Sequence, residues 1–79
     1  MEPLLSRIEI NPEVLVGKPV IKGTRLSVPF IVGLLAAGMS VEEVLAEYPR
    51  LHKDDIFACL LFATKALESN LFLPFEQRA

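Results

Sequence analysis

The segment of residues 53–70 carries more apolar surface than a small core can cover. At about 100° per residue, one face combines Ile56, Phe57, Leu60, Ala63, Thr64 and Leu67, and a second apolar stripe lies on the other side. A helix that is apolar nearly all round should be buried nearly all round. A chain of 79 residues buries a smaller share of its surface than a large one. We therefore expect the C-terminal tail or another chain to cover this helix.

This surplus of apolar surface predicts a homodimer or a larger homo-oligomer. Hydrophobic residues make up 52% of the chain, which is above the usual share for a globular domain. The expected oligomer interface combines the second stripe with two aromatic residues of the tail: Ala58, Cys59, Phe62, Ala66, Phe72 and Phe75.

Short strands are predicted in the first third of the chain. Polar and apolar residues alternate over residues 6–10, which is the period of a half-buried strand. Residues 19–28 also favour an extended backbone, with a break at Gly23. Because the connections are short, we expect two or three antiparallel strands.

Helix signals dominate from residue 27 onward. Ser27 is a good cap for a first helix, which should end at Gly38. Ser40 and Glu43 have the spacing of a capping box and start a second helix. The third helix is the apolar segment described above. The predicted fold is mainly α: a three-helix, helix-turn-helix-like bundle with a small N-terminal β-strand section. We expect one domain, 1–79, divided into a strand section (1–26), a three-helix section (27–70) and an apolar tail (71–79).

Catalytic and metal-site chemistry is not expected. Cys59 is the single cysteine and sits among Ala and Leu residues, which is typical of a buried thiol. His52 is the single histidine, and a metal site would need further ligands nearby. We expect no enzyme, no cofactor and no metal. The chain has no apolar run of membrane-spanning length and no signal-peptide pattern, so we expect a cytoplasmic protein without a membrane segment.

Cations gather in the stretch GKPVIKGTR, residues 17–25, although the net charge of the chain is −2. The stretch does not match a phosphate-binding P-loop, because its glycine spacing is too long and Lys22 precedes Gly23. We expect its glycines and Pro19 to shape turns. The cations that we expect to contact DNA or a protein partner are Lys18, Lys22, Arg25, Arg50 and Lys53.

The three predicted helices favour a comparison with helix-turn-helix proteins. Ala46 and Ile56 have the ten-residue spacing of the small and apolar residues that pack in such motifs. A helix that reads DNA should begin with cationic or amide groups. This one begins with Asp54 and Asp55, which would repel phosphates. We therefore expect the lone protein to bind DNA weakly, and more strongly in complex with a basic partner.

Several motifs together resemble the domain-of-unknown-function 433 family: Asn-Pro at 11–12, GKPVI at 17–21, GTRLSV at 23–28 and LLAAGMSVEEVLAEYPRL at 34–51. The resemblance covers roughly residues 7 to 68. It implies a helix-turn-helix-like fold with a small N-terminal strand section. It also implies a relation to antitoxins of the VapB type, which are encoded beside toxins with a PIN-like nuclease fold. One departure is His52, where the family usually has the better helix caps Thr or Ser.

Two functions remain open at this point. The first is an antitoxin that binds a PIN-like nuclease toxin and also promoter DNA. The alternative is a homo-oligomeric protein-interaction module with no DNA-binding role. The tail has two interpretations as well. Residues 71–79 fold back, or across a dimer, to cover Phe62 and Ala66, or they dock into a groove of the toxin with Arg78 as a charged anchor.

Overall fold

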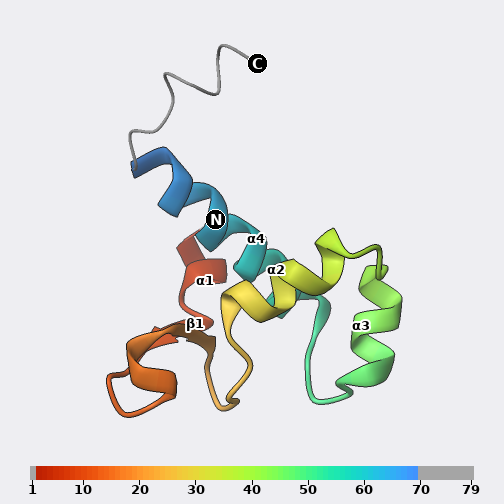
Figure 1. Cartoon of the computed structure of the whole chain (residues 1–79), viewed down its shortest axis with the longest axis horizontal. Helices are drawn as coiled ribbons and strands as arrows, with labels where there is room; N and C mark the ends of the chain where they lie inside the picture. Colours follow the sequence, from red (N-terminus) through yellow and green to blue (C-terminus); the bar gives the residue numbers. More distant parts are fainter. Residues whose placement is uncertain (1, 70–79) are drawn as a thin grey trace.

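The structure is a computed structural model, and it describes residues 2–69. Figure 1 shows a small sheet section at one end of the chain and three larger helices that pack around one core. The elements in chain order are α1 (Glu2–Leu5), β1 (Ile8–Ile10), a 3-10 turn η1 (Leu15–Gly17), β2 (Pro19–Ile21), α2 (Val28–Ala36), α3 (Val41–Glu47) and α4 (Lys53–Ser69). The expected fold class, mainly α with a small N-terminal β section, is confirmed.

Strands β1 and β2 form a two-stranded antiparallel sheet, as the short connections predicted. Ile8 lies opposite Ile21, and Ile10 lies opposite Pro19. The chain then folds back over β2, where the Ile21 N–H donates to the Leu26 carbonyl at 3.0 Å. Ile21 is buried, so the sheet contributes one side of the core.

The ends of α2 agree with the predicted caps. The Ser27 hydroxyl accepts a hydrogen bond from the Phe30 N–H at 3.1 Å, which satisfies an amide that the first turn leaves free. Gly38 has a φ of +107° just beyond the helix, a region that glycine enters without steric cost. These two local signals set where α2 begins and ends.

The capping box of α3 is also present. The Glu43 N–H donates to the Ser40 hydroxyl at 3.0 Å, and the Glu43 carboxylate accepts from the Ser40 N–H at 2.8 Å. Val44 is fully buried on the inner side of this helix. At the end of α3, the ring of Tyr48 meets Phe30 of α2 edge-on, with ring centres 6.0 Å apart. The box therefore sets the start of α3, and the ring contact joins its end to α2.

The core lies where β2, α2, α3 and α4 meet. Side chains from all four elements are buried in it: Ile21, Val28, Ile31, Val44, Leu51, Ile56 and Cys59. Among the helices of the described residues, none is both long and apolar enough to cross a membrane.

The inward face of α4 differs from the one that the sequence suggested. Ala58 and Cys59, which we expected at an oligomer interface, are both 0% exposed and pack inside the single chain. Phe57, Leu60 and Leu67 instead point outward and are 41%, 38% and 55% exposed. We call these three residues the outer stripe.

Helix α1, which the sequence did not predict, explains part of this difference. It packs against α4 from one side, while α2 packs from another (Figure 1). Leu5 of α1 lies near Phe62 and Ala66. The chain therefore covers more of the second stripe by itself than we expected.

Candidate functional site

Three of the five predicted contact cations lie around one turn. Strand β2 ends at Ile21, and the chain turns at Gly23, which has a φ of +78°. The Thr24 hydroxyl donates to the Ile21 carbonyl at 2.8 Å and accepts from the Leu26 N–H at 3.0 Å, so it holds the turn closed. Lys22 and Arg25 flank this turn.

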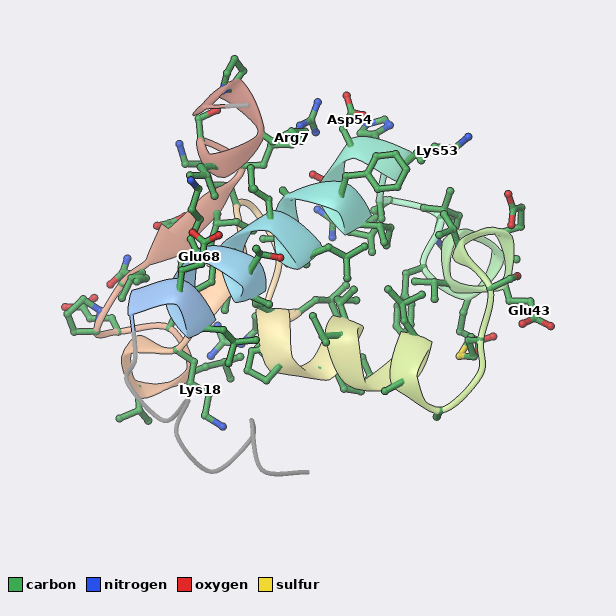
Figure 2. All side chains as sticks on the ribbon, turned by 90° about the horizontal axis from the view of Figure 1, so that it is seen from above. Arg7, Lys18, Glu43, Lys53, Asp54 and Glu68 are labelled. Atoms are coloured by element: carbon green, nitrogen blue, oxygen red, sulfur yellow. The ribbon has the colours of Figure 1, made fainter. Side chains whose placement is uncertain are left out.

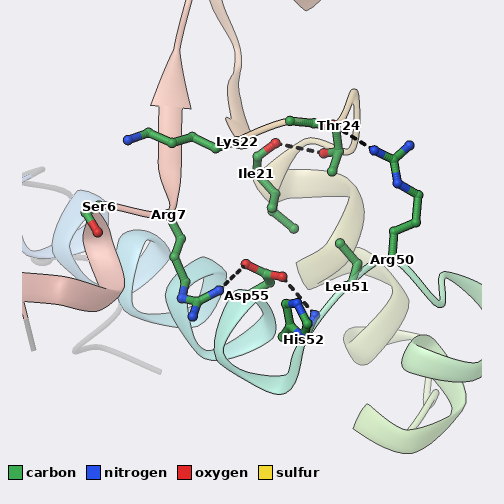
Figure 3. Close-up of a pocket in the computed structure, with 10 residues that line it drawn as sticks. Ser6, Arg7, Ile21, Lys22, Thr24, Arg50, Leu51, His52 and Asp55 are labelled. Carbon is green, nitrogen blue, oxygen red and sulfur yellow. Dashed lines mark hydrogen bonds and ion pairs between the residues drawn. The ribbon is translucent and has the colours of Figure 1, made fainter.

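Arg50 reaches the same turn from the link between α3 and α4. Its guanidinium lies 3.5 Å from the Gly23 carbonyl oxygen. Arg50 and Lys22 line a surface pocket of about 350 Å³, and Arg50 and Arg25 line a second depression beside it. We call Lys22, Arg25 and Arg50 the basic turn. The side chains of Lys22 and Arg50 extend in different directions from it, so their charged groups do not converge on one point (Figure 3).

The floor of the first pocket contains an ion pair that the sequence did not suggest. The Arg7 guanidinium donates to the Asp55 carboxylate at 3.0 Å (Figure 3). The second Asp55 oxygen accepts from the His52 N–H at 2.8 Å, so Asp55 also caps the start of α4. The His52 side chain is a poor cap, and Asp55, three residues later, forms the other half of a capping box by accepting from the His52 backbone N–H. Asp55 is only 6% exposed.

This ion pair changes how the start of α4 presents charge. We expected Asp54 and Asp55 to repel phosphates together. Asp55 is buried and paired, while the Asp54 side chain is 59% exposed and lies 3.7 Å from Arg7. Of the two carboxylates, only that of Asp54 therefore remains at the surface to repel phosphates, and the nearby charge of Arg7 partly offsets it.

Lys18 and Lys53 lie outside the basic turn. Figure 2 shows Lys53 beside Asp54 at the start of α4 and Lys18 on the far side of the molecule. The five predicted contact cations therefore do not all lie around one turn. Ala46 is exposed on α3, whereas Val44 is the buried residue of that helix and Ile56 is buried in α4.

An apolar groove runs between α2 and the second half of α4. It has a volume of about 440 Å³, and its walls include Val28, Pro29, Val32, Phe62, Ala63 and Leu67. Phe62 and Ala66, two of the predicted interface residues, both line it. Phe72 and Phe75, the other two that are not in the core, lie outside the described residues, as does the rest of the tail.

The Cys59 thiol has the character of a core group. Burial, and secondarily the Asp55 carboxylate, raises the pKa of Cys59 to about 12. Such a thiol carries almost no thiolate near neutral pH, so it is a poor nucleophile. Within residues 2–69, no three His, Cys, Asp or Glu side chains come together to hold a metal ion.

The sequence did not predict that Arg7 pairs with Asp55 at this surface. No local pattern connects Arg7 with Asp55, because the two residues are separated by 48 positions. The spacing of His52 and Asp55 did offer a signal for part of this site. An acidic residue three positions after a helix cap often accepts from the backbone N–H of the cap residue.

Comparisons with known proteins agree with this fold. A family model described as "Protein of unknown function (DUF433)" matches residues 8–63. The uncharacterised protein y4eO of Sinorhizobium fredii (strain NBRC 101917 / NGR234) is 38% identical over 53 residues, which are 67% of this chain and 24% of that protein. The chain therefore matches about a quarter of the length of this curated relative. A crystal structure of a DUF433 member protein from Anabaena variabilis ATCC 29413 has a TM-score of 0.76 and 31% identity, and the match covers 86% of this chain and 67% of that one.

Proposed function

We propose that this chain, which belongs to the DUF433 family of proteins of unknown function, is the antitoxin of a toxin–antitoxin pair. It acts in the cytoplasm and binds a nuclease toxin with a PIN-like fold. The proposal is of a binding protein and not of an enzyme. The resemblance to VapB-type antitoxins motivates the proposal. The exposed apolar residues of the chain and a neighbouring cation indicate which surface binds the toxin.

The outer stripe is the observation that carries this proposal. Phe57, Leu60 and Leu67 present large apolar side chains at the surface of a small domain. Contiguous exposed apolar surface usually marks a protein interface. Lys53 lies one turn before Phe57 on the same helix, so the stripe begins beside a cation. A nuclease that binds metal ions through carboxylates offers a matching acidic surface.

Co-purification tests this proposal directly. The chain is expressed together with the PIN-like protein from the neighbouring gene, and the complex is captured through the toxin. We expect Phe57→Glu to reduce the captured antitoxin at least tenfold, because it places a carboxylate in an apolar interface against an acidic partner. The matched control is Ala46→Glu, which adds the same side chain at an exposed position on α3. Equal capture of the two variants would overturn the assignment of the stripe.

DNA contact by the basic turn is a second candidate function. It is supported by Lys22, Arg25 and Arg50 around Gly23 and by the ion pair that neutralises Asp55. Three cations remain few for DNA, since affinity depends steeply on the number of phosphates neutralised. We therefore propose weak binding by the lone chain and stronger binding in complex with a basic partner.

Titration of labelled promoter DNA at moderate salt distinguishes these cases. We expect Arg25→Gln with Arg50→Gln to weaken the binding of the complex and to reduce its salt dependence by about two phosphate contacts. Lys18→Gln is the control, because Lys18 lines neither of the two pockets at the basic turn. Tight, sequence-selective binding by the lone chain would contradict the weak-binding part. A chain that self-associates but binds neither the toxin nor DNA would favour the alternative, a homo-oligomeric interaction module.

A further inference from the structure

We propose that the α2–α4 groove is the docking site of the chain's own C-terminal tail, residues 71–79, within the same molecule. The groove walls are almost entirely apolar and come from both helices: Val28, Pro29, Val32, Phe62, Ala63 and Leu67. The groove shares only Leu67 with the outer stripe, and the inference does not depend on the proposed function.

The composition of the tail matches this groove. Leu71, Phe72, Leu73 and Phe75 are four large apolar residues within five positions. Pro74 disfavours a continued helix and favours an extended backbone in the residue before it. An extended segment presents alternate side chains to one side, so Leu71, Leu73 and Phe75 can enter one groove together.

The place where the described chain ends favours the same molecule over a second copy. Leu67 lines the groove, and Ser69, the last described residue, follows two positions later. Asn70 comes next, and asparagine is one of the residues that accept the left-handed conformation with which helices commonly end. Direct attachment gives the tail an effective concentration on the order of millimolar, which a separate chain must match by its own concentration.

The length of the tail is sufficient. The stretch of α4 from Phe62 to Leu67 rises about 7.5 Å. Five extended residues, Leu71 to Phe75, span about 17 Å and can therefore run back along this stretch and beyond it. Pro19 also lines the groove, and the exposed Lys18 beside it offers an opposite charge to Glu76, which follows Phe75.

Nuclear Overhauser contacts in the full chain test the proposal without altering the protein. We expect contacts between the ring of Phe75 and the methyl groups of Val28 or Val32. In a mixture of labelled and unlabelled chains, an isotope filter retains only contacts between molecules. The proposal is overturned if the ring-to-methyl contacts are absent, or if they survive the filter, since the second result would assign the groove to the tail of a second copy.

Hydrogen exchange gives an independent measurement. The full chain is compared with a chain that ends at Asn70 and with the full-length double variant L73S and F75S. We expect roughly tenfold faster amide exchange over residues 62–67 in both altered proteins, with unchanged exchange in α3. A synthetic peptide of residues 70–79 in excess should restore the protection of the shortened chain. Gln77→Ala is the matched control, because it leaves the apolar residues in place. Unchanged exchange over residues 62–67 in both altered proteins would overturn the proposal.

Discussion

At the scale of single residues, Asp55 contributes more to the stability of the fold than its neighbour Asp54. Asp55 accepts from Arg7 and from the His52 N–H and is buried, whereas Asp54 is mostly exposed. We expect Asp55→Ala to lower the free energy of unfolding by about 2–4 kcal/mol, because it leaves Arg7 and an amide without their acceptor. Urea denaturation measures this. The matched variant Asp54→Ala should change stability by less than about 0.5 kcal/mol, and equal losses would contradict the role assigned to Asp55.

Cys59 makes a second prediction at this scale. Burial raises the pKa of its thiol from the ordinary value of 9.0 to about 12, so the folded state retains the thiol proton more strongly than the unfolded chain does. The resulting stabilisation is complete below pH 9 and is lost as the pH rises from about 9 towards about 12. We expect the free energy of unfolding to fall over this window by more in the native chain than in Cys59→Ala. Identical pH profiles for the two proteins would show that the thiol is not linked to folding.

The reactivity of the same thiol follows from its burial. With 0% exposure and a raised pKa, Cys59 should react with a thiol reagent at neutral pH only when the fold opens. We therefore expect labelling to accelerate with urea in parallel with unfolding. Fast labelling in the absence of denaturant would place Cys59 at the surface and contradict the core described for α4.

At the scale of elements, the capping box decides where α3 begins. Glu43 reaches back to the Ser40 N–H, whereas Glu42 occupies the same first turn without this reciprocal role. We expect Ser40→Ala and Glu43→Ala each to lower stability by about 1 kcal/mol, and the double variant to lose less than the sum. Glu42→Ala is the control and should change stability by a few tenths of a kcal/mol. Thermal or urea unfolding measures all four proteins, and additive losses at positions 40 and 43 would argue against the box.

The elements that were predictable from sequence have local signals. The Ser27 cap, the Ser40–Glu43 box and Gly38 each act within a few residues, and each is present in the structure. Helix α1 has only four residues and exists because it packs on α4, so its own sequence gives no sufficient signal.

The turn η1 and the inner face of α4 were not predictable for related reasons. Leu15 and Val16 have φ values of +49° and +56°, which non-glycine residues seldom adopt and which the surrounding chain must impose. Two apolar stripes on α4 are equivalent in periodicity, and only the positions of α1 and α2 decide which of them is buried. The same applies to the candidate site. The cations of GKPVIKGTR were evident in the sequence, but their grouping with Arg50 and the Arg7–Asp55 pair join residues far apart in the chain, so only the structure shows them.

At the scale of the whole molecule, self-association stays a prediction, and the structure relocates its surface. Because Ala58 and Cys59 lie in the core, we now expect a second copy to cover Phe57, Leu60 and Leu67. Light scattering at micromolar concentration should then give twice the chain mass of 8.8 kDa, and Leu60→Asp should give the monomer, because it buries a charge in the interface. A monomer mass for the native chain would contradict this prediction. Since the toxin is proposed to bind the same stripe, it should displace the second copy.

The packing of α1 and β1 against α4 has a consequence for how the protein is made. The ribosome releases the N-terminal residues first and α4 last among the described elements, yet Arg7 finds its partner only at Asp55. Until α4 emerges, α1 has no surface to pack on and the core lacks Ile56 and Cys59. The apolar residues of α2 therefore lack their α4 cover until α4 emerges, and the fold completes in one late step instead of growing outward from its beginning.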